Sequence, residues 1–199
     1  MQTILYREVD SVKRHMTDKA ASGRHAGFTI LEVLAAVGII VLLVGLLLPA
    51  LSKARTHTKK VVARTEAKQI ETAWGQYLSE YQQWPSNVIN EGNYTLTGTV
   101  VRILLGENLL KSNPKKIPFM NFVHGDSASN PISPWAKSKS DPSCYYYCRF
   151  DANYNQIIPG TGNTSNPPMN DVKRPVIVWT YNRDAKPADP DYIVGSWSE

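Results

Sequence analysis

Hydrophobic and polar residues are segregated along this chain rather than evenly mixed. Residues 28–51 are almost entirely apolar, and Glu32 is the only charged residue among them. A helix needs about 20 apolar residues to cross a bilayer, so this run is long enough to span a membrane. The stretch that precedes it, residues 1–27, is polar and basic.

Beyond the apolar run, hydrophobic residues recur at every third or fourth position. This spacing predicts a helix with one buried face, made of Val62, Ala63, Ala67, Ile70, Trp74, Tyr77, Leu78 and Tyr81. Pro85 cannot continue a helix, so we expect the helix to end near Gln83. Gly75 weakens such a helix, and we expect it to permit close packing against the rest of the domain. Pro49 predicts a kink near the end of the apolar run.

From residue 85 onward the pattern changes to short segments separated by loops. Residues 99–106 predict a short helix that ends at Gly106. Proline, serine and asparagine are dense over residues 114–140 and predict a long loop there. Strands are predicted at residues 144–150, 175–181 and 192–194, the last with a possible extension to 197. Short antiparallel strands packed on a helix form an α+β fold.

The net charge of +5, from 22 basic and 17 acidic residues, is unevenly distributed. One basic cluster precedes the apolar run and contains Arg7, Lys13, Arg14, Lys19 and Arg24. A second follows it and contains Lys53, Arg55, Lys59, Lys60, Arg64 and Lys68. Both positions suit a solvated or lipid-headgroup-facing surface. Nucleic-acid binding is not expected, because no groove-reading motif is present and the aromatic residues lie elsewhere.

The residue types that carry catalysis are sparse. None of the four histidines has a partner at catalytic or metal-binding spacing, and no serine-hydrolase, zinc-protease or phosphate-loop motif is present, so we do not expect an enzyme. Cys144 and Cys148 are the only cysteines. In a strand their Cα atoms would be too far apart for a disulfide, whereas in a helix or turn they would be within reach, so their spacing leaves the bond undecided.

The polar stretch meets the apolar run at a sharp boundary. The residues there are Gly27-Phe28-Thr29-Ile30-Leu31-Glu32-Val33-Leu34. A secretory signal places its cleavage site after the apolar stretch, but no Ala-x-Ala signal follows here, so we expect the apolar run to be retained. This boundary resembles the processing site of type IV prepilins and pseudopilins, and the chain most resembles a major-type pseudopilin of a type II secretion system.

The resemblance implies specific processing. A prepilin peptidase would cleave between Gly27 and Phe28 and would N-methylate Phe28. Glu32 would then pair with the new amino group on Phe28 of a neighbouring subunit during assembly. A carboxylate in a membrane helix is costly and is usually functional, which independently favours a partner for Glu32. In the family that this chain resembles, a proline in the region of Pro49 is common and is associated with local melting of the helix during filament packing. The alternative is a simple kink where the helix leaves the membrane.

The resemblance also implies an organisation and partners. The divisions are a cleaved leader at 1–27, a transmembrane half-helix at 28–51, an amphipathic half-helix at 52–84 and a periplasmic head at 85–199. Translation from Met1 or from Met16 gives the same mature chain. The implied fold is the type IV pilin-like fold, and the implied assembly is a homo-oligomeric helical filament. Its implied partners are the prepilin peptidase, an inner-membrane platform and other pseudopilins.

The implied location is the bacterial inner membrane, crossed once, with the head in the periplasm. The basic leader favours retention of the N-terminus in the cytoplasm.

The C-terminal stretch at 178–193 resembles the region of the major pseudopilin in which an acidic loop binds calcium. The ligands here would be Asp184, Asp189 and Asp191, completed by backbone carbonyls. Arg183, Lys186 and the lack of glycines depart from that pattern, so a metal-free turn stands as the alternative. Calcium is the only cofactor that the resemblance implies.

Three functions are compatible with these features. The leading hypothesis is a secretion pseudopilin that helps export folded proteins across the outer membrane. The second is a type IV pilin of a surface fibre that serves adhesion, motility or DNA uptake. The third is a signal-anchored periplasmic binding module with an incidental prepilin-like start.

Overall fold

The computed structural model describes residues 27–86, 88–89, 92–122, 125–126, 128–138, 144–163 and 166–197. Except for Gly27, the predicted leader lies outside the described residues, as does the alternative start at Met16. The chain divides into two units, Met1–Leu48 and Pro49–Glu199.

Helix α2, Ile30–Tyr81, has 52 residues and contains the whole predicted apolar run except its first two positions. Every large hydrophobic side chain within residues 28–51 is exposed, from 47 % at Val44 to 86 % at Phe28. An 18-residue window of α2 has a mean hydropathy of 2.9 and none of it is buried in the protein. By length and composition, α2 can therefore cross a membrane.

Pro49 lies inside α2 and is the first residue of the second unit. A proline nitrogen carries no hydrogen, so it cannot donate to the carbonyl four residues earlier, on Gly45. The helix thus lacks one backbone hydrogen bond at this position. The kink at Pro49 stays a prediction.

The second half of α2 buries one face, as the spacing of its apolar residues predicts. The buried residues are Ala63, Ala67, Ile70, Ala73, Trp74 and Tyr77. Trp74 is fully buried and packs in the main core with Ala67, Ala73 and residues of the sheet. Its ring meets Phe150 edge-on, with 4.9 Å between the ring centroids. The helix ends at Tyr81, slightly before the predicted end, because Gln82 adopts a left-handed backbone with φ +57°.

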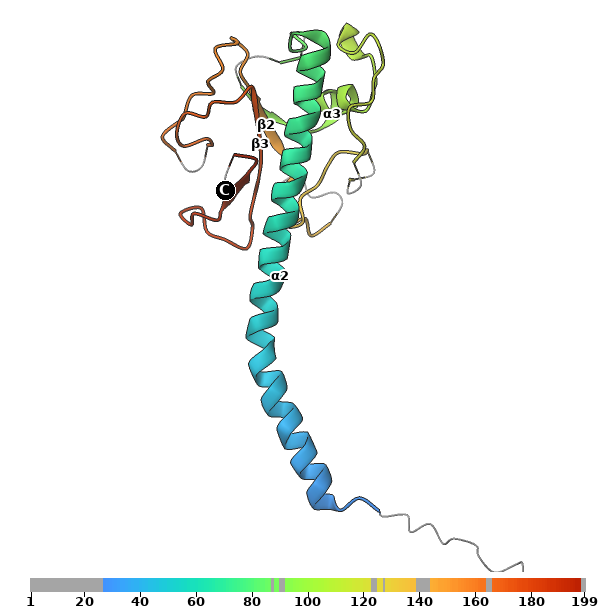
Figure 1. Ribbon diagram of the computed structural model, residues 1–199, viewed down its shortest axis with the longest axis vertical. Helices are drawn as coiled ribbons and strands as arrows, with labels where there is room; N and C mark the ends of the chain where they lie inside the picture. Colours follow the sequence, from blue (N-terminus) through green and yellow to red (C-terminus); the bar gives the residue numbers. More distant parts are fainter. Residues whose placement is uncertain are drawn as a thin grey trace, which may run out of the picture. The chain divides into compact units, whose positions relative to one another are not determined.

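Four strands form one antiparallel sheet in the order β1-β2-β3-β4. Their bounds are Asn93–Thr95 for β1, Tyr147–Phe150 for β2, Val176–Tyr181 for β3 and Ile193–Gly195 for β4. Within the second unit, β2 and β3 lie alongside α2 (Figure 1). The long helix and the small sheet confirm the α+β layout. The strands predicted from sequence are present, and β1 was not predicted.

Strand β3 is the centre of the head because both of its faces are buried. Val176 and Val178 belong to the main core with Trp74, on the side of α2. Ile177 and Trp179 face the other way and pack in a separate cluster with Ile158, which comes from the segment between β2 and β3. This two-sided burial explains why β3 reads as a continuous apolar run rather than an alternating one.

The segment after β1 contains helix α3, Gly98–Leu104, and the short 3₁₀ helix η1, Leu109–Lys111. The predicted short helix at 99–106 is thereby confirmed, and Gly106 follows it with a φ of +95°. Buried Asn113 organises the chain beyond η1. Its amide donates to the carbonyls of Ile103 and Ile117 at 3.0 and 2.9 Å, and its oxygen accepts from the hydroxyl of Tyr81 at 2.6 Å.

Gly75 is the one position in α2 where the packing expectation is wrong. A Cβ built on Gly75 meets no atom within 4 Å, so none of the described residues of the head packs closely against it. The glycine therefore weakens the helix without a compensating contact from the described part of the chain.

We expect Gly75→Ala to raise the free energy of unfolding by about 0.5–1 kcal/mol, because alanine is the better helix former and its methyl group enters open space. Urea unfolding of the full chain in detergent micelles measures this. Gly160→Ala is the matched control and should destabilise, since its Cβ would lie 2.5 Å from the carbonyl carbon of Asn170. A loss of stability in Gly75→Ala would contradict the open space seen around this residue.

Candidate functional site at the start of helix α2

The predicted cleavage site lies in non-helical backbone. Residues 27–29 precede the first turn of α2, and Phe28 is 86 % exposed. A Cβ built on Gly27 also meets no atom within 4 Å. The bond between Gly27 and Phe28 is therefore outside the helical hydrogen-bond ladder, and none of the described residues of its unit covers it.

Glu32 forms a reciprocal cap with Thr29 at the beginning of the helix. The backbone N–H and the hydroxyl of Thr29 donate to Oε2 of Glu32 at 2.9 and 3.0 Å, and the backbone N–H of Glu32 donates to the Thr29 hydroxyl at 3.2 Å. This is a capping box, with Thr29 at the N-cap and Glu32 as the third helical residue. Thr29 is a functional residue that the sequence analysis missed, although the Thr-x-x-Glu spacing is its signal.

The capping box leaves half of the carboxylate available. Both bonds that Glu32 accepts end on Oε2, and no hydrogen bond to Oε1 forms within the part of the chain that the structure describes. The cap satisfies part of the carboxylate inside its own helix, which reduces the cost of holding it in an apolar segment. Oε1 is left to accept a hydrogen bond from a donor outside the chain.

We expect Thr29→Val to remove the cap while keeping the shape of the side chain. A lost N-cap costs about 1 kcal/mol, so the amides of Glu32 and Val33, which donate to Thr29, should exchange with solvent about fivefold faster. Hydrogen exchange of these two residues, followed by NMR of the protein in micelles, measures this. Thr29→Ser retains the hydroxyl and should exchange like the original protein. Equal exchange in the valine variant would show that the cap does not hold the helix start.

The second predicted site is the loop that joins β3 to β4. It is closed by the N–H of Asn182, which donates to the carbonyl of Tyr192 at 2.7 Å. Two of its three aspartates pair with consecutive lysines of α2. Asp184 lies 3.4 Å from the ammonium of Lys59, and Asp191 pairs with Lys60. The third, Asp189, accepts a hydrogen bond from the backbone of its own loop.

The structure does not bring the three aspartates together around a metal position. Among the described residues, no group of three or more histidine, cysteine, aspartate or glutamate side chains could hold a metal ion. Lysine ammonium groups instead supply the positive charge that faces Asp184 and Asp191. The ion pairs with lysines are compatible with the metal-free alternative, and the calcium site stays a prediction.

We expect added Ca²⁺ to leave the Tm of the full chain in micelles unchanged, because lysines already face two of the three aspartates. A Tm that rises by several degrees with Ca²⁺ would support the calcium hypothesis.

We expect Lys60→Ala to lower the free energy of unfolding by less than about 1 kcal/mol, the usual contribution of an exposed ion pair. The loss in the double variant with Asp191→Asn should be smaller than the sum of the two single losses. Lys68→Ala, an exposed lysine of the same helix, is the control.

Cys144 and Cys148 are both buried as thiols, and no disulfide joins them in the structure. Cys148 lies within β2 and belongs to the main core, while Cys144 packs with Ala63, Trp135 and Val194. Burial raises the pKa of the Cys148 thiol, so this side chain stays protonated at neutral pH. Cys148 thus lies in a strand and Cys144 precedes it outside the strand, and the possible disulfide stays a prediction.

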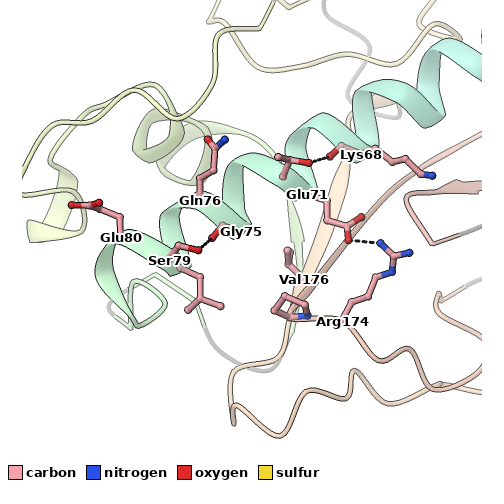
Figure 2. Close-up of a pocket in the computed structure, with 11 residues that line it drawn as sticks. Lys68, Glu71, Gly75, Gln76, Ser79, Glu80, Arg174 and Val176 are labelled. Atoms are coloured by element: carbon pink, nitrogen blue, oxygen red, sulfur yellow. Dashed lines mark hydrogen bonds and ion pairs between the residues drawn. The ribbon is translucent and has the colours of Figure 1, made fainter.

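A groove of about 770 Å³ runs along the exposed side of α2 beside Pro175 and Val176 (Figure 2). Several of its polar groups are engaged within the chain. Arg174 donates to Glu71 at 2.6 Å, and the hydroxyls of Thr72 and Ser79 donate to helix carbonyls. Gly75 also lines this groove. The groove was not foreseen from the sequence, because residues far apart in the chain form it.

Of the four histidines, one lies in the part of the chain that the structure describes. His57 is exposed on α2, while His15, His25 and His124 lie outside the described residues.

No family model matches the chain, and no curated protein or solved structure matches it either. A functional assignment must therefore be argued from the N-terminal motif, the apolar helix and their geometry.

Proposed function

We propose that this chain is a type IV pilin-like filament subunit, specifically a pseudopilin of a type II secretion system. In this proposal residues 28–51 insert into the inner membrane and the head lies in the periplasm. A prepilin peptidase removes the leader and methylates Phe28. Subunits then leave the membrane and stack into a filament that pushes folded proteins towards an outer-membrane channel.

The observation that carries the proposal is the uncovered apolar surface of α2. Every large hydrophobic side chain from Phe28 to Leu51 is at least 47 % exposed. Keeping this surface in water would cost on the order of tens of kcal/mol, at about 1.5–3 kcal/mol for each large side chain. A monomer in water cannot sustain that cost, so the segment needs lipid or the helices of other copies around it.

The start of the helix supports assembly rather than simple anchoring. A plain membrane anchor has no use for a carboxylate near its end, whereas an assembling subunit can use one to fix its position against a neighbour. Cleavage after Gly27 would create a positive amino group on Phe28, next to the cap formed by Thr29 and Glu32. The unbonded Oε1 of Glu32 can accept a hydrogen bond from the corresponding amine of an adjacent copy.

The first test is mass spectrometry of the protein extracted from membranes of cells that contain a prepilin peptidase. We expect a mature chain that begins at Phe28 and carries one additional methyl group. Gly27→Val should block cleavage and leave the leader attached. An untrimmed N-terminus in the original protein would remove the basis of the proposal.

Assembly is tested with Glu32→Ala in the same cells. The variant should be processed normally, but filaments should be lost, because the neighbour's amine has no carboxylate to pair with. Glu107→Ala, which removes an exposed carboxylate of the head, is the control and should assemble. Normal filaments from Glu32→Ala would eliminate the pairing hypothesis while leaving the processing result intact.

Two comparisons separate the alternatives. Deleting the prepilin peptidase abolishes assembly for a pseudopilin and for a type IV pilin, but has no effect on a binding module with an incidental motif. Loss of secreted enzymes on deletion of this chain then indicates secretion, and loss of surface fibres indicates a pilin of adhesion, motility or DNA uptake.

A further inference from the structure

The first turns of α2 beyond the apolar run carry basic side chains at a defined depth. The apolar run ends at Leu51, and α2 continues without interruption to Tyr81. At 1.5 Å per residue, Lys53 lies about 3 Å and Arg55 about 6 Å beyond Leu51 along the helix axis. The headgroup layer of one leaflet is roughly 5–8 Å thick. With Leu51 at the edge of the hydrocarbon, both side chains reach this layer.

These two basic side chains are exposed and are not neutralised by the protein. Neither Lys53 nor Arg55 takes part in an ion pair within the described part of the chain, whereas Lys59 and Lys60 are paired with loop aspartates. The sequence between Glu32 and Glu66 contains no acidic residue. An unscreened positive potential therefore surrounds this part of the helix.

The two threonine hydroxyls in the same turns already donate within the helix itself. The hydroxyl of Thr56 donates to the carbonyl of Ser52 at 3.3 Å, and that of Thr58 donates to the carbonyl of Ala54 at 3.0 Å. Lys53 and Arg55 are left as the strong hydrogen-bond donors facing outward. Their multiple N–H groups suit phosphate oxygens.

The directions of the two side chains favour lipid over a protein partner. With about 100° of rotation per residue, Lys53 and Arg55 point to nearly opposite sides of the helix. A protein docked on one face would contact only one of them. Lipid headgroups surround a membrane helix and can contact both.

We propose that Lys53 and Arg55 bind the phosphate groups of anionic phospholipids at the leaflet where α2 leaves the membrane. This inference rests on the proposed membrane insertion of α2. The contact fixes the depth of the helix in the bilayer and recruits anionic lipid around each inserted subunit. Removal of the subunit from the membrane then requires these headgroup contacts to break.

The test uses the full chain reconstituted in phosphatidylcholine vesicles that contain phosphatidylglycerol. Trace spin-labelled phosphatidylglycerol and phosphatidylcholine report, by electron paramagnetic resonance, how strongly each lipid associates with the protein. We expect anionic lipid to be preferred by up to about fivefold for each basic side chain, and the preference to shrink as salt is added.

The variant Lys53→Gln with Arg55→Gln should lower the preference to near one. The control, Lys68→Gln with Lys116→Gln, removes the same charge from exposed positions farther along the chain and should keep the preference. Equal association of both lipids with the original protein, or a preference that survives in the first variant, would overturn the inference. If neither lipid shows an immobilised population, α2 has not inserted, and the membrane part of the proposed function fails instead.

Discussion

The free-energy cost of exposing the apolar surface of α2 to water constrains the rest of this protein. A helix whose side chains are apolar on every side has no preferred face to bury against a single sheet, so it cannot be absorbed into a small head. The first half of α2 is of this kind, and the second half is one-sided. The first half of the helix thus needs lipid or the helices of other copies around it, and the second half packs against the head. The change from all-round to one-sided hydrophobicity marks the boundary between these two environments.

The second half of α2 is as much a part of the head as the sheet. Ala67, Ala73 and Trp74 belong to the main core with residues of β2 and β3, and Ala63 packs in a second cluster with Val194 of β4. Strand β3 receives this helix on one face and Ile158 on the other. The head therefore has its core on both sides of a sheet of only four strands, which compensates for the shortness of β1 and β4.

Features carried by periodicity or by local motifs could be predicted from the sequence. The apolar run, the buried face of α2, helix α3 and strands β2 to β4 each leave a local signal. Strand β1 has only three residues, and Asn93 at its start is a turn former, so its pairing with β2 decides its conformation. The left-handed Gln82 is equally invisible in sequence, because glutamine rarely adopts that conformation without tertiary support.

The residues of the candidate sites also fall into two groups, those that a local sequence pattern predicts and those that only the tertiary structure brings together. Gly27, Phe28 and Glu32 stand out by their order in the sequence, and the Thr29 cap follows from the Thr-x-x-Glu motif. The pairing of Asp184 with Lys59 joins residues that are 125 positions apart, and no local pattern encodes it. The loop sequence left calcium and a metal-free turn both open, because the lysines that face the loop belong to a distant helix. Asn113 is a similar case, since its three partners come from three separate segments.

The distribution of indole rings has a practical optical consequence. All five tryptophans belong to the second unit, and Trp74, Trp84, Trp135 and Trp179 are at most 3 % exposed. The apolar run contains neither tryptophan nor tyrosine. Ultraviolet emission from this protein therefore originates in the core of the head, and the apolar half of α2 is spectroscopically silent. Disruption of the head shows in that emission, while events confined to the apolar half leave it unchanged.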